Sequence, residues 1–388
     1  MVASPSCICL FSALYAPNVG GVEIYTANLA HALAALGHRV IVVTSNVCGL
    51  PEQEQDNGVE VIRLPSYAML SGRFPVPRRN ATFRRLMSWL ERQDTDHIVV
   101  NTRFYPLSRE GLAFAQAKGV VPVLIEHGSA HLTMGGPFID TGIHLAEHAM
   151  TRRALKLPAS YYAVSRKASV WLSHFDALSR GELSNSIDAD VYLSQASTRS
   201  FRKELNLPPN AFVAAFVGRL VREKGILELA RAVELVGDSR PVVVLAAGEG
   251  PLRTELALFE GDRFHLLGSL NRADVAALLS EADVLCLPSR SEGFATALLE
   301  AAACWTPAIV TDVGGTDELV PDSRFGTVIP NADPPTIARA LKDAAADTKT
   351  TALQGRLVGR LVRNKYSWKQ AAEHVLAACR AAQDPANH

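Results

Sequence analysis

The sequence predicts an α/β protein with two doubly wound units, and two observations lead to this prediction. Short apolar runs rich in β-branched residues alternate with longer segments of helical periodicity. The alternation restarts after about residue 200, which indicates two successive parallel sheets, each with helices on both faces. A length of 388 residues suits two domains, and 48% hydrophobic with 20% charged residues is ordinary for a globular chain.

The first domain is expected at 1–205 and opens with a βαβ unit. The run "CICLFSAL" predicts a strand, residues 22–36 a helix and "RVIVVTS" a second strand. Further strands are predicted at 97–101, 121–127 and 161–165.

The second domain is expected at 206–365, after the two prolines of "NLPPN" that mark a linker. Its predicted strands are 211–220, 241–250, 264–270, 283–289 and 307–315, with a helix at 224–236. Residues 366–388 predict a closing helix, with Ser367 as its N-cap, that packs back on the first domain.

Charge and cysteine content exclude several classes of function. The chain has 39 basic and 39 acidic residues, which argues against bulk nucleic-acid binding. No run approaches the ~20 apolar residues of a membrane span, and the N-terminus lacks the basic region of a signal peptide. Six scattered cysteines indicate free thiols in a reducing compartment, so a cytoplasmic protein is expected.

Ligands of open parallel sheets bind beyond the carboxyl ends of the strands, so residues there are candidates for a site. In "VGRLVREKGI", Arg219 and Lys224 follow a predicted strand near a helix start, which suits a diphosphate or, alternatively, a solvated basic loop. Gly248 in "AAGEGPLR" belongs to a partial dinucleotide fingerprint or to a simple tight turn, because Arg253 stands where a third glycine would be.

Two carboxylates stand out in "SEGFATALLEAAACW". Glu292 lies at a strand end and Glu300 lies two turns into an apolar helix, where a carboxylate can accept hydrogen bonds from sugar hydroxyls. The amides of Phe294 and Ala295 are expected to meet a phosphate at the helix start. The alternative is an acid favoured by the helix dipole together with a surface glutamate.

The segment "SEGFATALLEAAA" resembles the E-x7-E motif of the retaining glycosyltransferases of family 4, which have the GT-B fold. Further segments resemble the family in the expected order, from "APNVGGVEIYTANLAHALAALGHRVIVVT" through "EHG", "AVS", "VGRLVREKGI", "AGEGPLR" and "LLGSLNRADVAALLSEADVLCLPSRSEGF" to "VGGTDELV". The resemblance spans almost the whole chain and implies two Rossmann-like domains facing across a cleft.

The resemblance implies a role for each matching position. Arg219 and Lys224 would hold the diphosphate of a UDP- or GDP-sugar. Glu300 would bind its ribose, and Glu292 would contact the transferred sugar. Gly20 and Gly21 would allow the phosphate or acceptor to approach the backbone closely, and the donor site would also be lined by Gly248, Gly293, Phe294 and Ala295. No metal is implied, because cations and helix termini neutralise the leaving group. This agrees with the absence of an Asp-x-Asp motif near these strands.

His127 ends the predicted strand "VPVLIEH" and is followed by Gly128. A single histidine is often structural or exposed, but the resemblance places this one beside the anomeric centre. It would hydrogen-bond a donor-sugar hydroxyl and shape the site rather than act as a base.

The sequence departs from the family pattern at two places. Ala295, followed by Thr296, stands where the family often has glycine, which affects the fit near the sugar. The family's Asn-Gly-Val-Asp stretch is replaced by "YLSQASTRSF" at 192–201, which puts the hinge contacts in doubt.

The segment 63–92 holds seven arginines and one acid, Glu91. Within it, "RRNATFRRLMSWL" predicts a helix with basic and apolar sides. The part 73–92 is therefore suited to peripheral contact with an anionic membrane surface at the inner face or to a lipid-phosphate acceptor. The alternatives are a solvated basic helix or a patch that contacts an acidic glycan.

The sequence therefore predicts a hexosyltransferase that moves a sugar from a nucleoside diphosphate sugar to a glycan, glycolipid or lipid-linked acceptor. A GT-B sugar-nucleotide epimerase is the first alternative. A dinucleotide-dependent oxidoreductase is disfavoured, because "YAPNVGGVE" lacks a complete glycine fingerprint. A binding protein without activity is disfavoured by the joint presence of Arg219, Lys224, Glu292 and Glu300.

Overall fold

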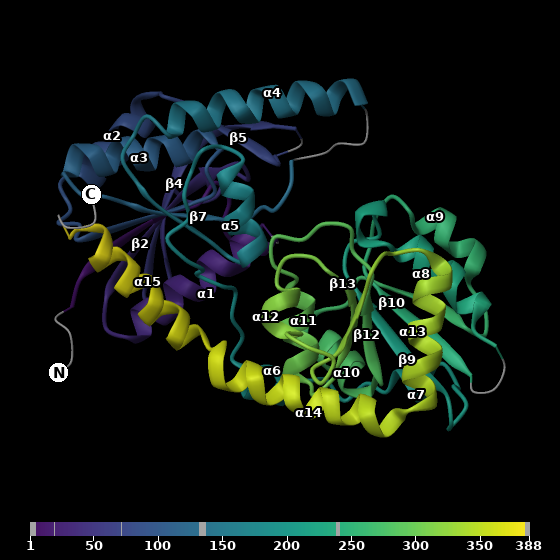
Figure 1. The fold of residues 1–388 in the computed structure, drawn as a ribbon. Coiled ribbons are helices and arrows are strands. Elements are labelled where there is room, and N and C mark those ends of the chain that lie inside the picture. The colour runs from purple at the N-terminus through teal and green to yellow at the C-terminus, as the bar shows by residue number, and fades with distance from the viewer. Residues whose placement is uncertain (1–4, 19, 71, 132–136, 238–240, 385–388) are drawn as a thin grey trace. The chain divides into compact units, whose positions relative to one another are not determined.

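The chain folds into two compact units, each built around one β-sheet (Figure 1). The computed structural model describes residues 5–18, 20–70, 72–131, 137–237 and 241–384. Unit 1 comprises Met1–Asn185 and Trp368–His388, and unit 2 comprises Ser186–Ser367. The predicted α/β class with two largely parallel sheets is confirmed.

Unit 1 holds eight strands and the helices that cover them. Its strands are β1 (Cys7–Phe11), β2 (Arg39–Asn46), β3 (Gln53–Asp56), β4 (Val59–Met69), β5 (Phe74–Pro77), β6 (His97–Asn101), β7 (Val123–Glu126) and β8 (Ser160–Ala163). Its helices are α1 (Gly21–Ala35), α2 (Ala81–Glu91), α3 (Pro106–Lys118), α4 (Pro137–Ala154), α5 (Arg166–Ser173) and α15 (Trp368–Ala382).

The sheet of unit 1 has the order β3-β4-β2-β1-β6-β7-β8, with β5 paired to β4. From β1 the strand order continues through β2 and β4 toward one edge of the sheet, and through β6, β7 and β8 toward the other edge. The order therefore reverses between β1 and β6, and ligands of such sheets bind at this switch point. The strands β3 and β5 are antiparallel, so the expectation of a purely parallel sheet is wrong there. The hairpin between β3 and β4 turns at Asn57 and Gly58, both with positive φ, a pair favoured in such turns.

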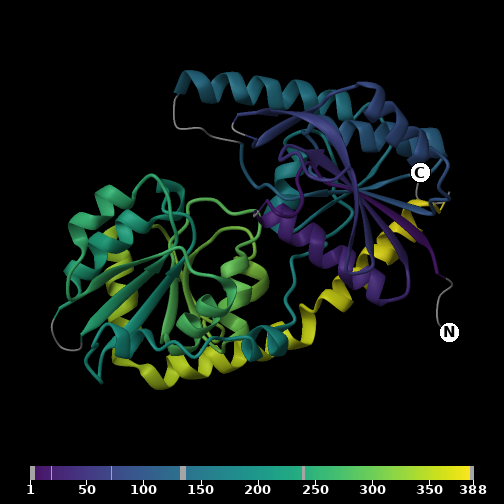
Figure 2. The ribbon, with the colours of Figure 1, turned by 180° about the vertical axis from the view of Figure 1, so that it is seen from behind.

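Helices cover both faces of the first sheet, which explains why β1 and the centre of β2 are buried on both sides. In Figures 1 and 2, α2 and α3 lie on one face, and α1 and α15 lie on the other. The rings of Tyr25 on α1 and Trp368 on α15 lie 5.6 Å apart, so the last helix completes the core of the first unit.

Unit 2 contains a six-stranded sheet in the order β11-β10-β9-β12-β13-β14. Its strands are β9 (Phe212–Val217), β10 (Val242–Ala247), β11 (Phe264–Gly268), β12 (Val284–Leu287), β13 (Ala308–Thr311) and β14 (Thr327–Ile329). Its helices are α6 (Ala189–Ser194), α7 (Phe201–Glu204), η1 (Arg222–Lys224), α8 (Ile226–Leu235), α9 (Arg253–Leu256), η2 (Ala257–Phe259), α10 (Arg272–Glu281), α11 (Thr296–Ala303), α12 (Thr316–Leu319), α13 (Pro334–Ala346) and α14 (Thr348–Lys365).

All neighbouring strands of this second sheet pair in parallel. Figure 1 shows α8 and α13 on one face and α10 and α11 on the other. The strand order reverses between β9 and β12, so the switch point of unit 2 lies between these two strands.

Unit 2 begins earlier than the linker at 206–210 indicated. The segment before that linker packs on the second sheet's helices through side-chain contacts. Ser197 donates to Asp274 at 2.6 Å, and Arg202 pairs with Asp283 at 2.7 Å. Unit 2 therefore includes α6 and α7. The two prolines mark a turn inside this unit rather than its boundary.

Gly248 allows the loops after β9 and β10 to interlock. Its φ is +145°, and a Cβ added there would lie 1.9 Å from the carbonyl oxygen of Gly218. Leu220 N–H donates to Glu249 O at 2.9 Å, so the loop that carries Arg219 is fixed to the loop that carries Gly248. The structure thus gives Gly248 a packing role that the partial dinucleotide fingerprint did not indicate.

In the described part of the arginine-rich segment 63–92, only Ala81–Glu91 forms a helix, α2, because residues before it lie in β4 and β5. Asn80 is its N-cap and accepts from Phe83 N–H at 2.9 Å. Acids outside the segment pair with three of its arginines: Glu54 with Arg63, Glu110 with Arg79 and Glu52 with Arg85. The local surface is therefore less basic than the segment alone indicates, and contact with a membrane stays a prediction. Among the described residues, none of the helices combines the length and hydropathy needed to cross a bilayer.

Candidate functional site

The switch point of unit 2 brings two predicted site residues into direct contact. Lys224 follows β9 and Glu292 follows β12, and Lys224 Nζ donates to Glu292 Oε1. Both side chains are largely buried, with 22% and 10% of their surface exposed. Because β9 and β12 are parallel neighbours, their carboxyl ends meet at one edge, which explains how residues 68 positions apart form an ion pair.

A glycine lets the chain turn at Lys224. Gly225 has φ of +67°, and a Cβ added there would lie 2.1 Å from the carbonyl oxygen of Pro288. The loop after β9 therefore packs directly on the loop after β12, and no larger residue fits between them. This contact brings Lys224 beside the loop that carries Glu292.

Glu292 is held by its own loop and by the loop after β13. Ser289 Oγ donates to Glu292 Oε1 at 2.8 Å, and Gly314 N–H donates to Glu292 O at 3.2 Å. A Cβ added at Gly314 would lie 2.2 Å from the carbonyl oxygen of Gly293. The glycine pair in "VGG" thus supports the Glu292 loop, a role that the sequence did not reveal.

The start of α11 differs from the expectation for Phe294 and Ala295. The Ala295 N–H donates to Gly314 O at 3.1 Å, so it is already occupied, and a phosphate would meet it only if this bond opened. Phe294 is buried against Gly315, where an added Cβ would lie 3.2 Å from its ring. Both residues therefore hold the loop together.

Arg219 is exposed beside this ion pair. Its guanidinium forms no hydrogen bond or ion pair with the part of the chain that the structure describes. A Cβ added at the preceding Gly218 would lie 3.9 Å from Lys224 Cδ, so the Arg219 backbone is close to the Lys224 side chain. A free cation next to a paired one leaves the edge of the sheet able to attract an anion.

Glu300 is half-buried on α11. The buried residues of this helix are otherwise leucines and alanines. Burial raises the pKa of its carboxyl to about 7, and the nearby Arg272 opposes this shift. Its carboxylate forms no hydrogen bond or ion pair with the described residues. An acid that is desolvated and unpaired gains from ligand hydroxyls that donate to it.

The switch point of unit 1 holds the other predicted residues. Gly20 and Gly21 follow β1, Asn101 ends β6, and His127 follows β7. His127 Nε2 lies 2.8 Å from Asn101 Oδ1, and its ring meets Tyr25 edge-on at 4.8 Å between centres. Asn101 was missed by the sequence analysis, although an amide at the end of a buried strand is itself a signal.

Neighbouring hydrogen bonds assign the protonation state of His127. The Asn101 amide Nδ2 donates to Thr26 Oγ1 at 3.0 Å, so its Oδ1 faces His127 and accepts from Nε2–H. Burial lowers the pKa of His127 to about 3, so the imidazole is neutral at physiological pH. Its Nδ1 is then a lone-pair acceptor for a hydroxyl group.

Glu23 is a second residue that the sequence analysis missed. A Cβ added at Gly20 would lie 2.3 Å from Glu23 Oε2, so the carboxylate folds back over the glycine. Burial raises the pKa of Glu23. Gly21 has open space around its Cα, and a Cβ there would meet nothing within 4 Å.

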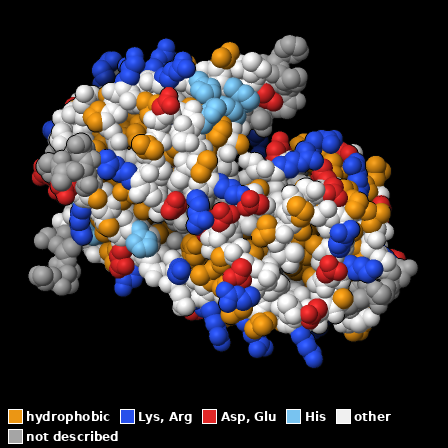
Figure 3. Space-filling model, viewed as in Figure 1, with side chains coloured by type: hydrophobic (Ala, Val, Ile, Leu, Met, Phe, Trp, Pro, Cys, Tyr) orange, Lys and Arg blue, Asp and Glu red, His pale blue; other side chains and the backbone are white. Residues whose placement is uncertain are grey.

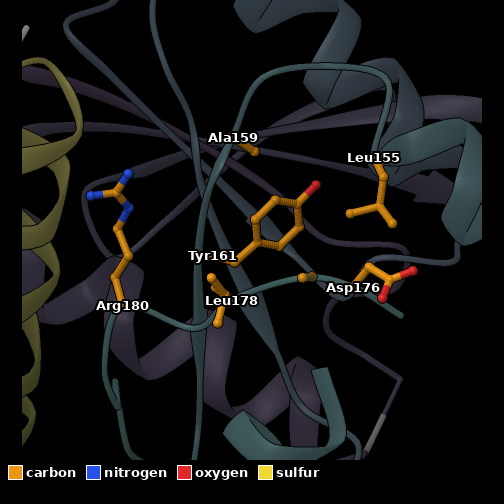
Figure 4. Close-up of a pocket in the computed structure, with 7 residues that line it drawn as sticks. Leu155, Ala159, Tyr161, Asp176, Leu178 and Arg180 are labelled. Carbon is orange, nitrogen blue, oxygen red and sulfur yellow. The ribbon is translucent and has the colours of Figure 1, made fainter. Parts of the chain in front are cut away.

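A separate pocket of unit 1 lies away from these residues. Figure 4 shows Tyr161 of β8 in its middle, with Leu155 and the loop residues Asp176, Leu178 and Arg180 around it. None of the predicted site residues lines this pocket.

Comparison with known proteins decides the family. The pattern "Glycosyltransferase Family 4" matches residues 19–209, and "Glycosyl transferases group 1" matches residues 197–356. A putative teichuronic acid biosynthesis glycosyltransferase, TuaC of Bacillus subtilis, is 30% identical over 275 residues, which is 69% of this chain and 67% of TuaC. The chain belongs to glycosyltransferase family 4. It is therefore a glycosyltransferase, and the resemblance noted in its motifs is confirmed.

Solved structures agree on the GT-B fold of this glycosyltransferase. Sucrose-phosphate synthase of Thermosynechococcus elongatus superposes with a TM-score of 0.74 at 22% identity, covering 97% of this chain and 98% of that protein. HepE of Anabaena, solved in complex with UDP-glucose, gives 0.70 at 16% identity, covering 97% and 100%. At these identities the likeness supports the fold alone.

We expect Glu300 to make the stability of the ligand-free enzyme depend on pH. Its raised folded-state pKa means that its contribution to stability is full below the unfolded value near 4.5 and is lost as pH rises through about 7. The free energy of unfolding of the wild type, minus that of Glu300→Gln, should therefore fall by about 2–3 kcal/mol between pH 5 and 8. Urea unfolding at several pH values measures this difference, and parallel profiles would contradict the assignment.

Proposed function

We propose that this glycosyltransferase moves a hexose from a UDP- or GDP-sugar to an acceptor hydroxyl, with retention of anomeric configuration, in the synthesis of a cell-surface glycan or glycolipid. The observation that carries the proposal is the contact of Lys224 with Glu292 at the switch point of unit 2, beside the unpaired Arg219. The name of TuaC supports a polysaccharide acceptor, and the UDP-glucose bound to HepE supports a nucleotide-sugar donor.

The donor diphosphate is expected to take over the Lys224 ammonium. In the structure Glu292 pairs with this cation, and Arg219 has no partner among the described residues. A diphosphate carries more negative charge than one carboxylate and offers several acceptor oxygens, so it competes for Lys224 and recruits Arg219. The two cations then neutralise the leaving group without a divalent ion.

Release from Lys224 frees Glu292 for the sugar, while Glu300 accepts from the ribose hydroxyls. Ser289 still donates to Glu292 Oε1 and fixes the carboxylate in place. We propose that His127 accepts a hydrogen bond from a sugar hydroxyl through its Nδ1. The acceptor is presented by unit 1 near Gly20, Gly21 and Glu23.

In the proposed reaction the acceptor oxygen attacks the anomeric carbon from the face that the diphosphate leaves. The bond between the anomeric carbon and the phosphate oxygen breaks while the new glycosidic bond forms. The acceptor proton passes to the departing phosphate oxygen, so no protein base is required. A neutral His127 suits this scheme, because its low pKa makes it a weak base.

Removing either cation should weaken nucleotide binding. Arg219→Ala and Lys224→Ala should each lower the affinity for UDP or GDP by about 10- to 100-fold, because a charge-assisted hydrogen bond to phosphate is lost. Arg222→Ala is the matched control, because this exposed arginine of the same segment pairs with Glu255 at 3.3 Å. Isothermal titration calorimetry measures the affinities. Unchanged binding in both variants would show that the diphosphate does not bind at this edge of the sheet.

Glu292→Ala should separate turnover from binding. We expect turnover to fall by about 100-fold, because a contact to the reacting sugar is lost. Affinity for the nucleoside diphosphate should stay equal or rise, because Lys224 no longer has an internal partner. Steady-state kinetics and calorimetry on one preparation test both parts, and a variant with full turnover would place Glu292 outside the site.

The anomeric configuration of the product tests the reaction itself. A screen of UDP- and GDP-sugars by thermal shift identifies the donor, and NMR of the product made with an oligosaccharide or lipid-linked acceptor should show the donor's configuration. An inverted linkage would refute retention. A changed sugar epimer without any acceptor would instead establish the epimerase.

A further inference from the structure

Three histidines of unit 1 lie close together and take no part in the proposed transfer reaction. His131 lies in the loop after β7, His148 lies on α4, and His174 caps the end of α5. One ring nitrogen from each lies within 4.8 Å of the other two. Figure 3 shows histidine side chains gathered on the surface beside α4.

The three rings form a nearly equilateral triangle. The distances between their centres are 5.3 Å for His131 and His148, 5.2 Å for His148 and His174, and 5.4 Å for His131 and His174. Zn–N bonds of about 2.0–2.1 Å at tetrahedral angles hold three imidazole centres roughly 5.2 Å apart. The rings therefore already have the separation that a shared ion requires, and rotation of the rings aligns the nitrogens.

A carboxylate orients the first of these imidazoles. Glu147 Oε2 lies 2.9 Å from His131 Nδ1, so Nδ1–H donates to it, and in the neutral imidazole Nε2 then carries the lone pair. The Glu147 side chain is only 2% exposed, and its Oε1 pairs with the buried Arg103. Such an outer carboxylate fixes the tautomer and raises the basicity of the ligand in metal sites.

Aromatic packing alone accounts less well for this cluster. Trp171 and Phe175 meet His131 edge-on and would surround a ring of any kind. Packing does not require ring nitrogens from three separate segments to lie within 4.8 Å of one another, nor a buried acid behind one of the rings. His174 is exposed, so the cluster is open to solvent on one side and an ion can enter.

We propose that His131, His148 and His174 bind a divalent transition-metal ion, with Zn²⁺ as the expected ion. Three neutral imidazoles and no thiolate or extra carboxylate ligand suit Zn²⁺, Ni²⁺ or Cu²⁺ and disfavour Mg²⁺ and Ca²⁺, which prefer oxygen. A solvent molecule completes the fourth position. The site is independent of the proposed donor and supplies no group to the transfer reaction.

The ion would fix the loop that follows the proposed sugar-binding histidine. Arg103 pairs with Glu126 at 2.6 Å as well as with Glu147, and Glu126 Oε1 accepts from Gly128 N–H at 2.8 Å. A continuous chain of charged contacts thus runs from His131 to the residues on either side of His127. Binding of the ion would tie His131, and with it the described part of this loop, to α4 and α5.

Zinc titration of the tag-free, chelator-stripped protein tests the site. Calorimetry should show one Zn²⁺ per chain, and His148→Ala and His174→Ala should each weaken binding by at least about 100-fold. His374→Ala is the matched control, because His374 is an exposed histidine of the same unit on α15. Zn²⁺ should raise the unfolding temperature of the wild type and of this control, but not of the other two variants.

Co²⁺ provides an independent readout, because its visible absorption reports tetrahedral coordination by nitrogen. The spectrum should appear with the wild type and His374→Ala, and it should be lost with His148→Ala. Neither His148 nor His174 is buried, so both variants should keep the far-ultraviolet circular dichroism of the wild type. A folded wild type that binds no Zn²⁺, or equal binding by all variants, would overturn the proposal.

Discussion

The parallel pairing of β9 with β12 is the constraint on which the proposed donor site depends. It brings the loop that ends in Lys224 and the loop that carries Glu292 to one edge of the sheet. Gly225 and Gly314 then allow these loops to approach their neighbours at distances that no side chain permits. The ion pair keeps both side chains ordered before any ligand arrives, which lowers the entropy cost of binding.

Buried charge plays a different part in unit 1. Arg103 is 1% exposed and sits between two carboxylates of similar burial, Glu126 and Glu147. An arrangement of this kind contributes little net stability, because desolvation offsets the attraction of the charges. Its effect is positional: it holds the backbone on both sides of His127 and orients His131.

Much of the fold could be predicted from periodicity, because buried parallel strands such as β1, β9 and β10 are continuous apolar runs. The strands β3, β4, β5 and β14 were not predicted. For β3 the reason is that "QEQD" has no apolar pattern and its hairpin is set by Asn57 and Gly58. Lys224 and Glu292 could be predicted from their positions after strands, but their contact could not, because it depends on strand order. Asn101 and the histidine cluster were not predicted for the same reason, because their partners lie in segments that only the folded chain brings together.

The position of α15 has a consequence for synthesis on the ribosome. Its buried residues, including Trp368, cover α1 in unit 1, yet they are translated after the whole of unit 2. The apolar surface of the nascent first unit therefore stays uncovered while the ribosome synthesises the more than a hundred and eighty residues of unit 2. A premature stop before this helix would leave that surface uncovered and accessible to chaperones and proteases.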